Sequence, residues 1–213
     1  MSDAPSAWQG DLDRDDLNED AVPAHPLALF GHWYEAARGC GLKEPSAMTL
    51  ATIDPDGRPS ARIVLLKGFD ADGFRFYTNY ESRKGAALAV HPDAALVFWW
   101  EPIERQVRVT GTVHKLGPED ADAYFARRAR ISRIGAHASP QSEVIPGRAE
   151  LDQRLSRAEA QFEGRDVPRP PHWGGYALVA DSIEFWQARH GRLHDRLRYR
   201  RDNDAWALER LAP

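Results

Sequence analysis

The residues best suited to chemistry lie near the C-terminus, where every second residue from 192 to 200 is a cation. They are Arg192, His194, Arg196, Arg198 and Arg200. Because side chains alternate between the two faces of a strand, an extended segment would place all five on one face. Such a row repels itself unless an anion lies against it, and arginine is suited to bind phosphate and stack on flat rings. The pattern predicts a strand that holds an anionic, planar ligand, flanked by Trp186 and Tyr199.

A second candidate lies in segment 78–84, where Ser82 is placed to cap a helix that continues to about residue 91. A helix N-terminus offers free N–H groups and a positive dipole end. Arg83 and Lys84 in the first turn disfavour the helix unless an anion neutralises them. The segment predicts a phosphate site, and the alternative of two solvent-exposed cations stays open.

Two strand-like segments carry weaker signals. Arg62 and Lys67 stand at the two ends of an apolar run, where a spacing of five places them on opposite faces of a flat strand. The alternative is a buried strand whose cations reach solvent at its ends. Gln106 and Arg108 share a strand face, so the amide could contact the edge of a heterocycle. A solvent-facing glutamine explains that pattern equally well.

A possible phosphate site also appears on the predicted helix 118–129. Tyr124 and Arg128 are four residues apart and so lie on one helix face, with Ser132 following just after the helix. Two hydroxyl groups and a guanidinium could bind a phosphate together. Taken alone, an amphipathic helix with a basic rim explains the same residues.

Several known motifs are missing from the sequence. It has no Gly-rich dinucleotide fingerprint, Walker loop, His-Glu-x-x-His or Gly-x-Ser-x-Gly motif. Cys40 is the only cysteine, and His190 and His194 have ligand-like spacing only on a helix, so we expect no disulfide and no metal site. Several phosphate-type sites without a dinucleotide loop indicate a mononucleotide cofactor and a phosphorylated substrate. The residues alone do not choose the mononucleotide.

Composition limits the class of protein. A chain of 213 residues with a formal net charge of −4 is unlike a general nucleic-acid binder, which is usually basic. No apolar run is long enough to span a bilayer and no secretory signal is visible, which predicts a cytoplasmic protein without membrane contact. Residues 11–20 hold six acids, so we expect residues 1–25 to form a mobile acidic arm and residues 26–213 a single domain.

Short strands dominate the expected elements. Strands are predicted at 48–53, 60–67, 74–78, 96–100, 106–115, 176–179, 183–187, 195–200 and 205–211. Helices are predicted at 26–38, 82–91, 118–129 and 148–162. Helices and strands do not alternate regularly, which argues against a parallel Rossmann-type sheet. The pattern predicts a mainly β (α+β) fold, an antiparallel barrel with flanking helices.

Taken together, the motifs resemble one family. They are Arg62-Ile-Val-Leu-Leu-Lys67, Phe76-Tyr-Thr-Asn79, Ser82-Arg-Lys84, Glu104-Arg-Gln-Val107, Ser132-Arg-Ile-Gly135, Gln141-Ser142, Glu184-Phe-Trp-Gln187, Arg192-Leu-His-Asp-Arg196 and Arg210-Leu-Ala-Pro213. From about residue 26 to the end, the chain is similar to pyridoxamine (pyridoxine) 5′-phosphate oxidases. The resemblance implies an FMN-binding split β-barrel that is a homodimer with FMN at the subunit interface. It also implies oxidation of pyridoxamine or pyridoxine 5′-phosphate to pyridoxal 5′-phosphate by O2, giving hydrogen peroxide.

The resemblance also implies roles for individual residues. The expected FMN contacts are Arg62, Ile63, Val64, Leu65, Leu66, Lys67, Tyr77, Thr78, Arg83, Lys84, Gln106, Gln141, Ser142, Trp186 and Arg196. The expected substrate contacts are Lys67, Tyr124, Arg128, Ser132, Arg192, Leu193 and His194. Arg192 and His194 are the expected catalytic residues, covering the pyridine ring while a hydride passes from substrate C4′ to flavin N5.

The chain departs from the family pattern at two places. Residues 6–13 contain Trp8 but lack the arginines expected in a segment that closes over the substrate, and His137 stands where a tryptophan is expected. Two other functions remain to be weighed. One is an FMN enzyme of the same fold with another substrate, such as a phenazine-type oxidase or a flavin reductase, and the other is a non-catalytic carrier of flavin or pyridoxal phosphate. Lys67, Tyr124, Arg128 and Ser132 favour a phosphorylated substrate.

Overall fold

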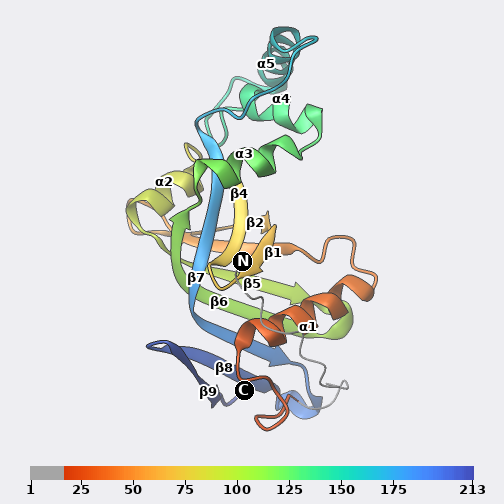
Figure 1. The fold of residues 1–213 in the computed structure, drawn as a ribbon, viewed down its shortest axis with the longest axis vertical. Coiled ribbons are helices and arrows are strands. Elements are labelled where there is room, and N and C mark those ends of the chain that lie inside the picture. The colour runs from red at the N-terminus through yellow and green to blue at the C-terminus, as the bar shows by residue number, and fades with distance from the viewer. Residues whose placement is uncertain (1–16) are drawn as a thin grey trace.

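A computed structural model describes residues 17–213, which form an antiparallel sheet with helices around it (Figure 1). The strands are β1 (Ala47–Ile53), β2 (Pro59–Leu65), β3 (Gly68–Asp70), β4 (Gly73–Asn79), β5 (Asp93–Trp100), β6 (Arg105–Lys115), β7 (Trp173–Gln187), β8 (Asp195–Asp202) and β9 (Ala205–Arg210). The helices are α1 (Pro26–Gly39), α2 (Arg83–Val90), α3 (Pro118–Ala126), α4 (Arg130–Ala138) and α5 (Arg148–Gln161), with short 3₁₀ turns η1 (Glu101–Ile103) and η2 (His190–Arg192).

The strand order explains why the barrel is split. The order is β2-β1-β5-β6-β7-β4-β3, and β2 and β3 at its two ends do not pair with each other. Strand β7 pairs with β6 along most of its length, with β4 near its start and with β8 near its end. The prediction of a split antiparallel barrel with flanking helices is therefore confirmed.

Helix α1 supplies an apolar face to the main core. His25 accepts a hydrogen bond from the Leu27 amide at the N-cap, and Pro26 occupies the first turn, where no N–H is needed. Phe30 and Trp33 are at most 1% exposed, and Trp33 packs edge-on against Phe185 of β7 at 5.2 Å. The apolar spacing in this segment thus forms a helix that is fixed by tertiary packing.

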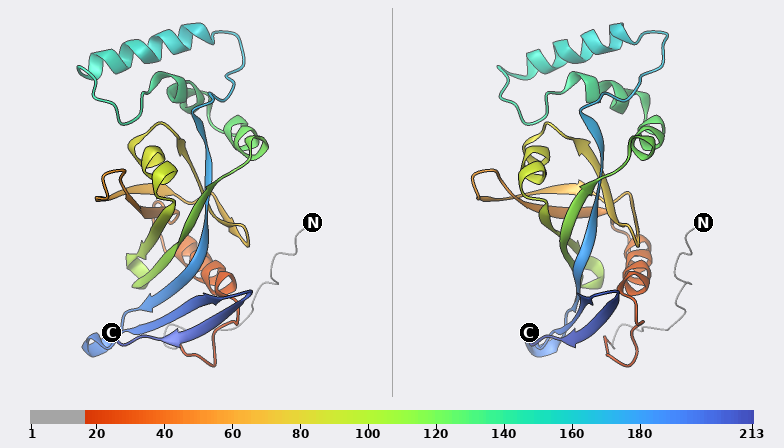
Figure 2. Two further views of the ribbon diagram at one scale, coloured as in Figure 1. Left: turned by 90° about the vertical axis from the view of Figure 1, so that its left-hand side faces the viewer. Right: turned by 60° about the vertical axis from the view of Figure 1, so that its left-hand side comes forward.

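The long strand β7 separates two ends of the molecule (Figure 2). Helices α3, α4 and α5 lie at its N-terminal end, where α4 and α5 form a small second core that includes Ile134 and Phe162. Strands β8 and β9 lie at its C-terminal end. Residues that contact opposite ends of β7 are therefore far apart within one chain.

The prediction of two strands at 176–179 and 183–187 was wrong. Asp181 and Ser182 look like a break in sequence, but β7 continues through them because β6 pairs on both sides. The ladder shifts register between Thr110 and Gly111, which indicates a β-bulge. A Cβ on Gly111 would lie 2.0 Å from the Val179 carbonyl oxygen, so the close approach requires glycine.

The helical region after residue 117 also differs from the prediction. One helix over 118–129 was expected, whereas α3 ends at Ala126 and α4 begins at Arg130. Helix α4 was not predicted as an element. Neither helix has a side-chain N-cap bond, so the usual start signal is missing, and the packing of α4 against α5 sets its position.

The described part of the N-terminal region contacts the C-terminal strands. Leu17 is 4% exposed, and Tyr199 donates a hydrogen bond to the Pro23 carbonyl at 2.7 Å. The arm expected over 1–25, the single domain over 26–213 and their boundary stay predictions. Residues 1–16, with the departure noted around Trp8, lie outside the described residues. Within residues 17–213, no helix combines the length and apolar character needed to cross a membrane.

Candidate active site

A cluster of cations surrounds the start of α2. Ser82 is buried and caps the helix, accepting a hydrogen bond from the Gly85 amide. The Lys84 ammonium donates to Thr78 Oγ1 at 2.9 Å and to Gln141 Oε1 at 2.6 Å. Gln141 is distant in sequence, so the fold brings together three residues that were predicted to contact FMN. Ser142, the residue after Gln141 and also a predicted FMN contact, is exposed and has a backbone φ of 75°.

Two arginines lie beside this cluster. Arg62 donates to Thr52 Oγ1 and to Ser60 Oγ, each at 2.7 Å. Arg83 is paired through its Nε with Asp54 Oδ2 at 2.9 Å, and Asp54 is 3% exposed. Three cations therefore meet near one carboxylate, a charge imbalance that suits a phosphate.

The protonation equilibria reflect this imbalance. Burial, and then the positive charge of Arg62, lower the pKa of Lys84 to about 8. Burial is also the main cause that lowers the pKa of Arg62, opposed by Asp54 and assisted by Arg83. A bound anion would oppose both shifts, because it favours the charged form of each side chain.

Strand β2 lies at an edge of the sheet, where its backbone is unpaired on one side. Along the predicted segment, Ile63 is 63% exposed, Val64 and Leu65 are half-buried, and Leu66 is buried in the core. Leu66 can therefore meet a ligand only through its main chain. Lys67 follows β2 and is exposed, and its amide bonds to the Arg75 carbonyl, two residues before Tyr77.

A second cluster lies where α3 meets the start of β7. Tyr124 stacks on Tyr77 with centroids 3.9 Å apart, and the Arg128 guanidinium lies over the Trp173 ring at 4.6 Å. The fold thus places Tyr124 and Arg128, which were predicted to contact the substrate, beside Tyr77, which was predicted to contact FMN, although Arg128 follows α3 rather than belonging to it. Ser132 is exposed in the first turn of α4, and within residues 17–213 no side-chain hydrogen bond or ion pair joins it or Lys67 to this cluster.

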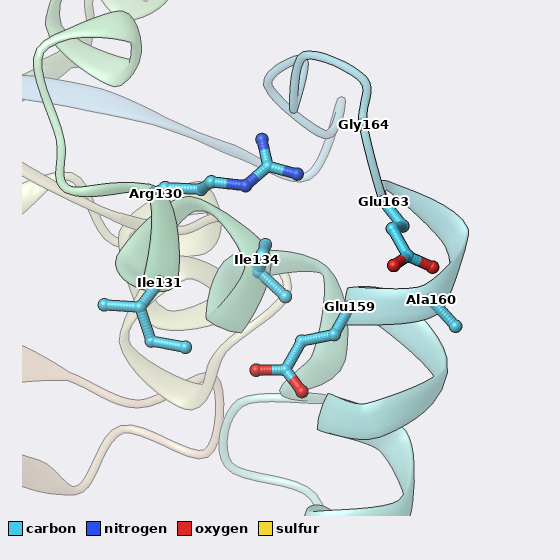
Figure 3. A pocket seen from close by; sticks show the side chains of 7 residues that line it. All are labelled: Arg130, Ile131, Ile134, Glu159, Ala160, Glu163 and Gly164. Atoms are coloured by element: carbon cyan, nitrogen blue, oxygen red, sulfur yellow. The ribbon is translucent and has the colours of Figure 1, made fainter.

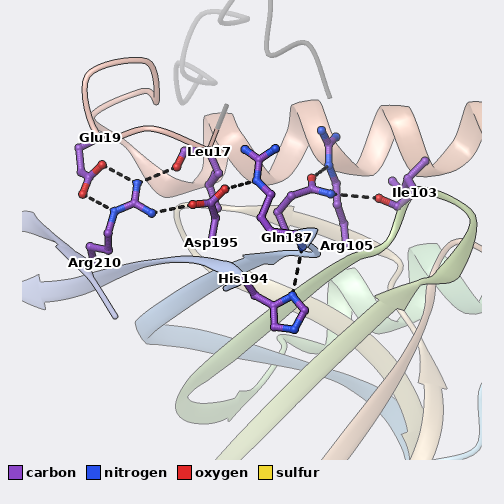
Figure 4. Close-up of polar contacts among 9 residues, drawn as sticks. Leu17, Glu19, Ile103, Arg105, Gln187, His194, Asp195 and Arg210 are labelled. Atoms are coloured by element: carbon purple, nitrogen blue, oxygen red, sulfur yellow. Dashed lines mark hydrogen bonds and ion pairs between the residues drawn. The ribbon is translucent and has the colours of Figure 1, made fainter. Parts of the chain in front are cut away.

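A third group crosses the sheet at the far end of β7. Gln106, Trp186 and Arg196 are direct register partners on β6, β7 and β8, so their side chains share one face. The His194 ring lies 4.5 Å from the Trp186 ring, and its Nδ1 accepts a hydrogen bond from the Arg189 amide at 3.1 Å (Figure 4). The fold therefore places three residues that were predicted to contact FMN beside His194, which was predicted to contact the substrate.

The strand predicted at 195–200 is β8, but the cationic row was expected to lie on one strand face from Arg192 onward. Arg192 ends η2 with a φ of 62°, and β8 starts only at Asp195, so residues 192, 194 and 196 do not share a strand face. Gly191, with a φ of 69°, turns the chain at this point. Arg192 and Leu193 are exposed on the resulting turn, Leu193 at 74%.

The rest of the cationic row is neutralised within the chain. Arg196 donates to Glu184 at 2.9 Å, whereas Arg198 and Arg200 both pair with Glu209. Tyr199 is 1% exposed in the core, so the prediction that it flanks the ligand was wrong. The carboxylates come from β7 and β9, and their positions depend on strand register, which the sequence pattern did not give.

Polar contacts link the His194 turn to both termini of the described chain (Figure 4). Arg189 pairs with Asp195, and Asp195 accepts from Arg210 at 2.8 Å. Arg210 also donates to both carboxylate oxygens of Glu19, each at 2.6 Å. These contacts brace the turn that carries Arg192.

The predicted residues therefore form two sets at opposite ends of β7. Trp173 contacts Arg128 at one end, and Trp186 contacts His194 at the other. At about 3.3 Å per residue, these two positions on β7 are roughly 40 Å apart along the strand. A single ligand cannot touch both sets in one chain.

A separate hollow of about 640 Å³ lies between α4 and α5 (Figure 3). Its lining residues are Arg130, Ile131, Ile134, Glu159, Ala160, Glu163 and Gly164. None of them belongs to the predicted site, and Arg130 already donates to the carbonyl groups of Phe162 and Arg165. His137, the other departure from the family pattern, bonds through Nε2 to the Pro168 carbonyl at 2.7 Å and lies 4.6 Å from the Phe162 ring.

Family models match both parts of this arrangement. Residues 35–162 match the model described as pyridoxamine 5′-phosphate oxidase. Residues 173–213 match the model described as the pyridoxine 5′-phosphate oxidase C-terminal dimerisation region. The chain belongs to the pyridoxamine 5′-phosphate oxidase family. The second match begins at β7 and covers β8 and β9, and it includes Trp186, His194 and Arg196 of the far set.

Relatives of known name support the assignment to the oxidase family. The chain is 55% identical over 203 residues to the pyridoxine/pyridoxamine 5′-phosphate oxidase of Salinibacter ruber, covering 94% of each chain. It is 56% identical to the enzyme of the same name from Burkholderia cenocepacia, again covering 94% of each chain. These relatives align with nearly the whole chain, so the similarity is not confined to one motif.

Solved structures show the same fold. PhzG from Burkholderia lata 383, in complex with tetrahydrophenazine-1-carboxylic acid, matches with a TM-score of 0.87 and 33% identity over 93% of this chain and 98% of that chain. An FMN-binding protein related to pyridoxamine 5′-phosphate oxidase from Nostoc punctiforme matches with a TM-score of 0.70 and 19% identity over 90% of this chain and all of that chain. The second likeness supports the fold alone.

Two residues of the clusters were missed by the sequence analysis. Trp173 lies under Arg128, and Asp54 is the carboxylate that pairs with Arg83. Asp54 lies between the strands predicted at 48–53 and 60–67, in a segment to which no role was assigned. Trp173 lies ahead of the predicted strand at 176–179, so it was not placed in any element.

Proposed function

We propose that the protein oxidises pyridoxamine 5′-phosphate or pyridoxine 5′-phosphate to pyridoxal 5′-phosphate, with FMN as cofactor and O2 as electron acceptor, releasing hydrogen peroxide. The observation that carries this function is the presence of two separate anion-binding clusters beside β4. One contains Arg62, Arg83 and Lys84, and the other contains Tyr124 and Arg128. Two phosphate-bearing ligands fit them better than one.

The donor set around α2 fits the phosphate of FMN. Lys84 and Arg62 have lowered pKa values that an anion would restore, and the helix N-terminus adds its dipole. The unpaired edge of β2 offers main-chain groups to the ring system. Gln106, Trp186 and Arg196 form a flat row with a polar amide and an aromatic face, which suits the isoalloxazine ring.

When bound, FMN supplies the acceptor for the hydride of substrate C4′ and passes the electrons to O2. Lys67, Tyr124, Arg128 and Ser132 hold the substrate phosphate, and Arg192 and His194 cover its pyridine ring. The Arg189 amide donates to His194 Nδ1, so the neutral imidazole carries its proton on Nε2. His194 therefore presents an N–H donor, while Arg192 orients the substrate.

The separation along β7 supports a homodimer in which each site combines the two sets of residues from different protomers. FMN would lie at the interface, between the α2 cluster of one protomer and the Trp186 row of its partner. The match to a dimerisation region over residues 173–213 agrees with this arrangement. A cytoplasmic location stays a prediction.

A second candidate function is oxidation of a phenazine precursor, favoured by the likeness to PhzG. Such a substrate carries a carboxylate but no phosphate. Tyr124 and Arg128 as a second anion-binding cluster favour the phosphorylated substrate, and so does the higher identity to the named pyridoxine/pyridoxamine 5′-phosphate oxidases.

The test combines a spectrum with a turnover assay. The purified protein should be yellow with bound FMN and should form pyridoxal 5′-phosphate and hydrogen peroxide from both phosphorylated substrates. A yellow protein that releases no peroxide from them, but oxidises tetrahydrophenazine-1-carboxylic acid, would support the second candidate. A yellow protein inactive with all three would be a carrier.

A further inference from the structure

The surroundings of Arg128 differ from those of two other half-buried arginines in this region. Arg133 pairs with Asp166 and Arg169 with Asp122, whereas no ion pair joins Arg128 to any carboxylate in residues 17–213. Its NH1 atom is buried without a hydrogen-bond acceptor, and burial is the main cause that lowers its pKa. Partial burial of a guanidinium without a counter-charge is costly unless a ligand supplies one.

Trp173 is the platform under this guanidinium. Its ring lies 4.6 Å from the Arg128 guanidinium carbon, and the residue is 7% exposed. Its main chain is held on both sides, because its amide donates to the Pro170 carbonyl at 3.0 Å and its carbonyl accepts from Arg169 at 2.7 Å. The indole is therefore a fixed surface.

The same ring lies beside the tyrosines of the cluster. Tyr124 is parallel to Trp173 within 6° at 6.2 Å, and Tyr77 is parallel within 12° at 5.7 Å. Tyr124 in turn stacks on Tyr77, and the Phe125 ring lies 5.4 Å from the Arg128 guanidinium, further than the Trp173 ring. Trp173 is therefore the ring that contacts Arg128 most closely and also lies parallel to both tyrosines.

We propose that Trp173 is a positioning residue for the substrate phosphate: its indole face holds Arg128 and Tyr124 in the geometry that binds the phosphate. An aromatic face attracts a cation without using its N–H donors, whereas a carboxylate would occupy them and cancel the charge. Trp173 therefore leaves the guanidinium charged and available. This proposal rests on the proposed oxidase function.

The experiment replaces the aromatic face and measures phosphate binding in two ways. Trp173→Leu should raise the KM for pyridoxine 5′-phosphate about tenfold while kcat changes by less than about twofold. By calorimetry, the Kd for pyridoxal 5′-phosphate should rise by a similar factor, while FMN affinity stays within about twofold. Trp173→Phe keeps a weaker aromatic face, so its KM and Kd should lie between those of the wild-type protein and Trp173→Leu. This variant also gives a measurement if Trp173→Leu does not fold.

The matched control is Trp206→Leu, because Trp206 also lies against an arginine, Arg201, at 5.2 Å but on β9. It should leave both constants unchanged. In an Arg128→Lys background, Trp173→Leu should lose most of its effect. An unchanged KM in folded, active Trp173→Leu and Trp173→Phe would overturn the role of Trp173 alone, whereas a wild-type protein that does not oxidise pyridoxine 5′-phosphate would overturn the proposed function.

Discussion

At the residue scale, the charge state of Lys84 links the structure to cofactor binding. Its pKa of about 8 means that the folded apoprotein holds this proton less tightly than the unfolded chain does. The unfolded chain therefore binds more protons between about pH 8 and the ordinary lysine pKa, and the free energy of unfolding rises with pH in that window. A bound phosphate acts in the opposite direction, because it stabilises the ammonium.

We predict that FMN affinity falls as pH rises above about 8, by about tenfold per pH unit at most, because binding then requires uptake of a proton by Lys84. Fluorescence titration of the apoprotein with FMN at about pH 7 and about pH 9 measures the change. Lys84→Arg should remove most of this pH dependence, since arginine stays charged. Equal affinity at the two pH values in the wild-type protein would contradict the lysine's role.

We also predict that Arg192→Ala retains bound FMN, because Arg192 lies on an exposed turn outside the two anion-binding clusters. The variant should lose about a hundredfold or more in kcat/KM, because Arg192 no longer orients the substrate. Absorbance of the purified variant gives the flavin content, and steady-state kinetics give the rate. Arg200→Ala, whose arginine is exposed and paired with Glu209, is the control and should keep near wild-type activity. Parallel loss of flavin and activity would rule out this role for Arg192.

At the element scale, the anion-binding cluster of Arg62, Arg83 and Lys84 depends on where α2 begins. Gly85 lies in the first turn of α2, and a Cβ there would lie 2.0 Å from the Tyr80 carbonyl oxygen. The turn before α2 therefore packs directly on the helix, and this contact fixes the direction of the N-terminus that carries Arg83 and Lys84. The cap at Ser82 alone would not set that direction.

We predict that Gly85→Ala lowers the free energy of unfolding by about 1–3 kcal/mol and weakens FMN binding, because the helix must move away from Tyr80. Thermal unfolding with and without FMN measures both effects. Gly135→Ala is the matched control, since Gly135 lies in α4 with nothing within 4 Å of its added Cβ. It should be neutral or stabilising by up to about 1 kcal/mol. A Gly85→Ala protein as stable as Gly135→Ala would show that α2 can shift freely.

At the scale of the whole molecule, the length of β7 decides how a site can be assembled. One end carries Trp173 with Arg128, and the other carries Trp186 with His194. The chain cannot fold back on itself to join them, because β6 pairs with β7 along most of that distance. A second copy, in which the two ends exchange places, is the simplest way to complete two equal sites.

A subunit-mixing experiment tests this assembly. Arg128→Ala and Arg192→Ala should each be nearly inactive alone, but a mixture of equal amounts, unfolded and refolded together, should regain about a quarter of wild-type activity. Half of the random dimers are then heterodimers, and one of their two sites has both arginines intact. Activity that stays at the level of the separate variants, in a mixture shown to contain heterodimers, would place both residues in the same protomer's site.

Local sequence signals determined much of the fold. The residue pattern of 26–38 predicted α1, Ser82 predicted the start of α2, and the strand-like segments 48–53 and 60–67 predicted β1 and β2. These features depend on interactions within a few residues, so they can be recognised without the tertiary structure. The motif resemblance also indicated the family before any contact was known.

Only the tertiary structure decided which of these residues meet. The alternation from Arg192 to Arg200 looked like one ligand-binding row, but Gly191 turns the chain, and Glu184 and Glu209 neutralise most of the row from neighbouring strands. Trp173 came to underlie Arg128 because β7 extends further than its apolar residues indicate. Strand register and packing between distant segments set these contacts, and neither is encoded in the spacing of residues along a single segment.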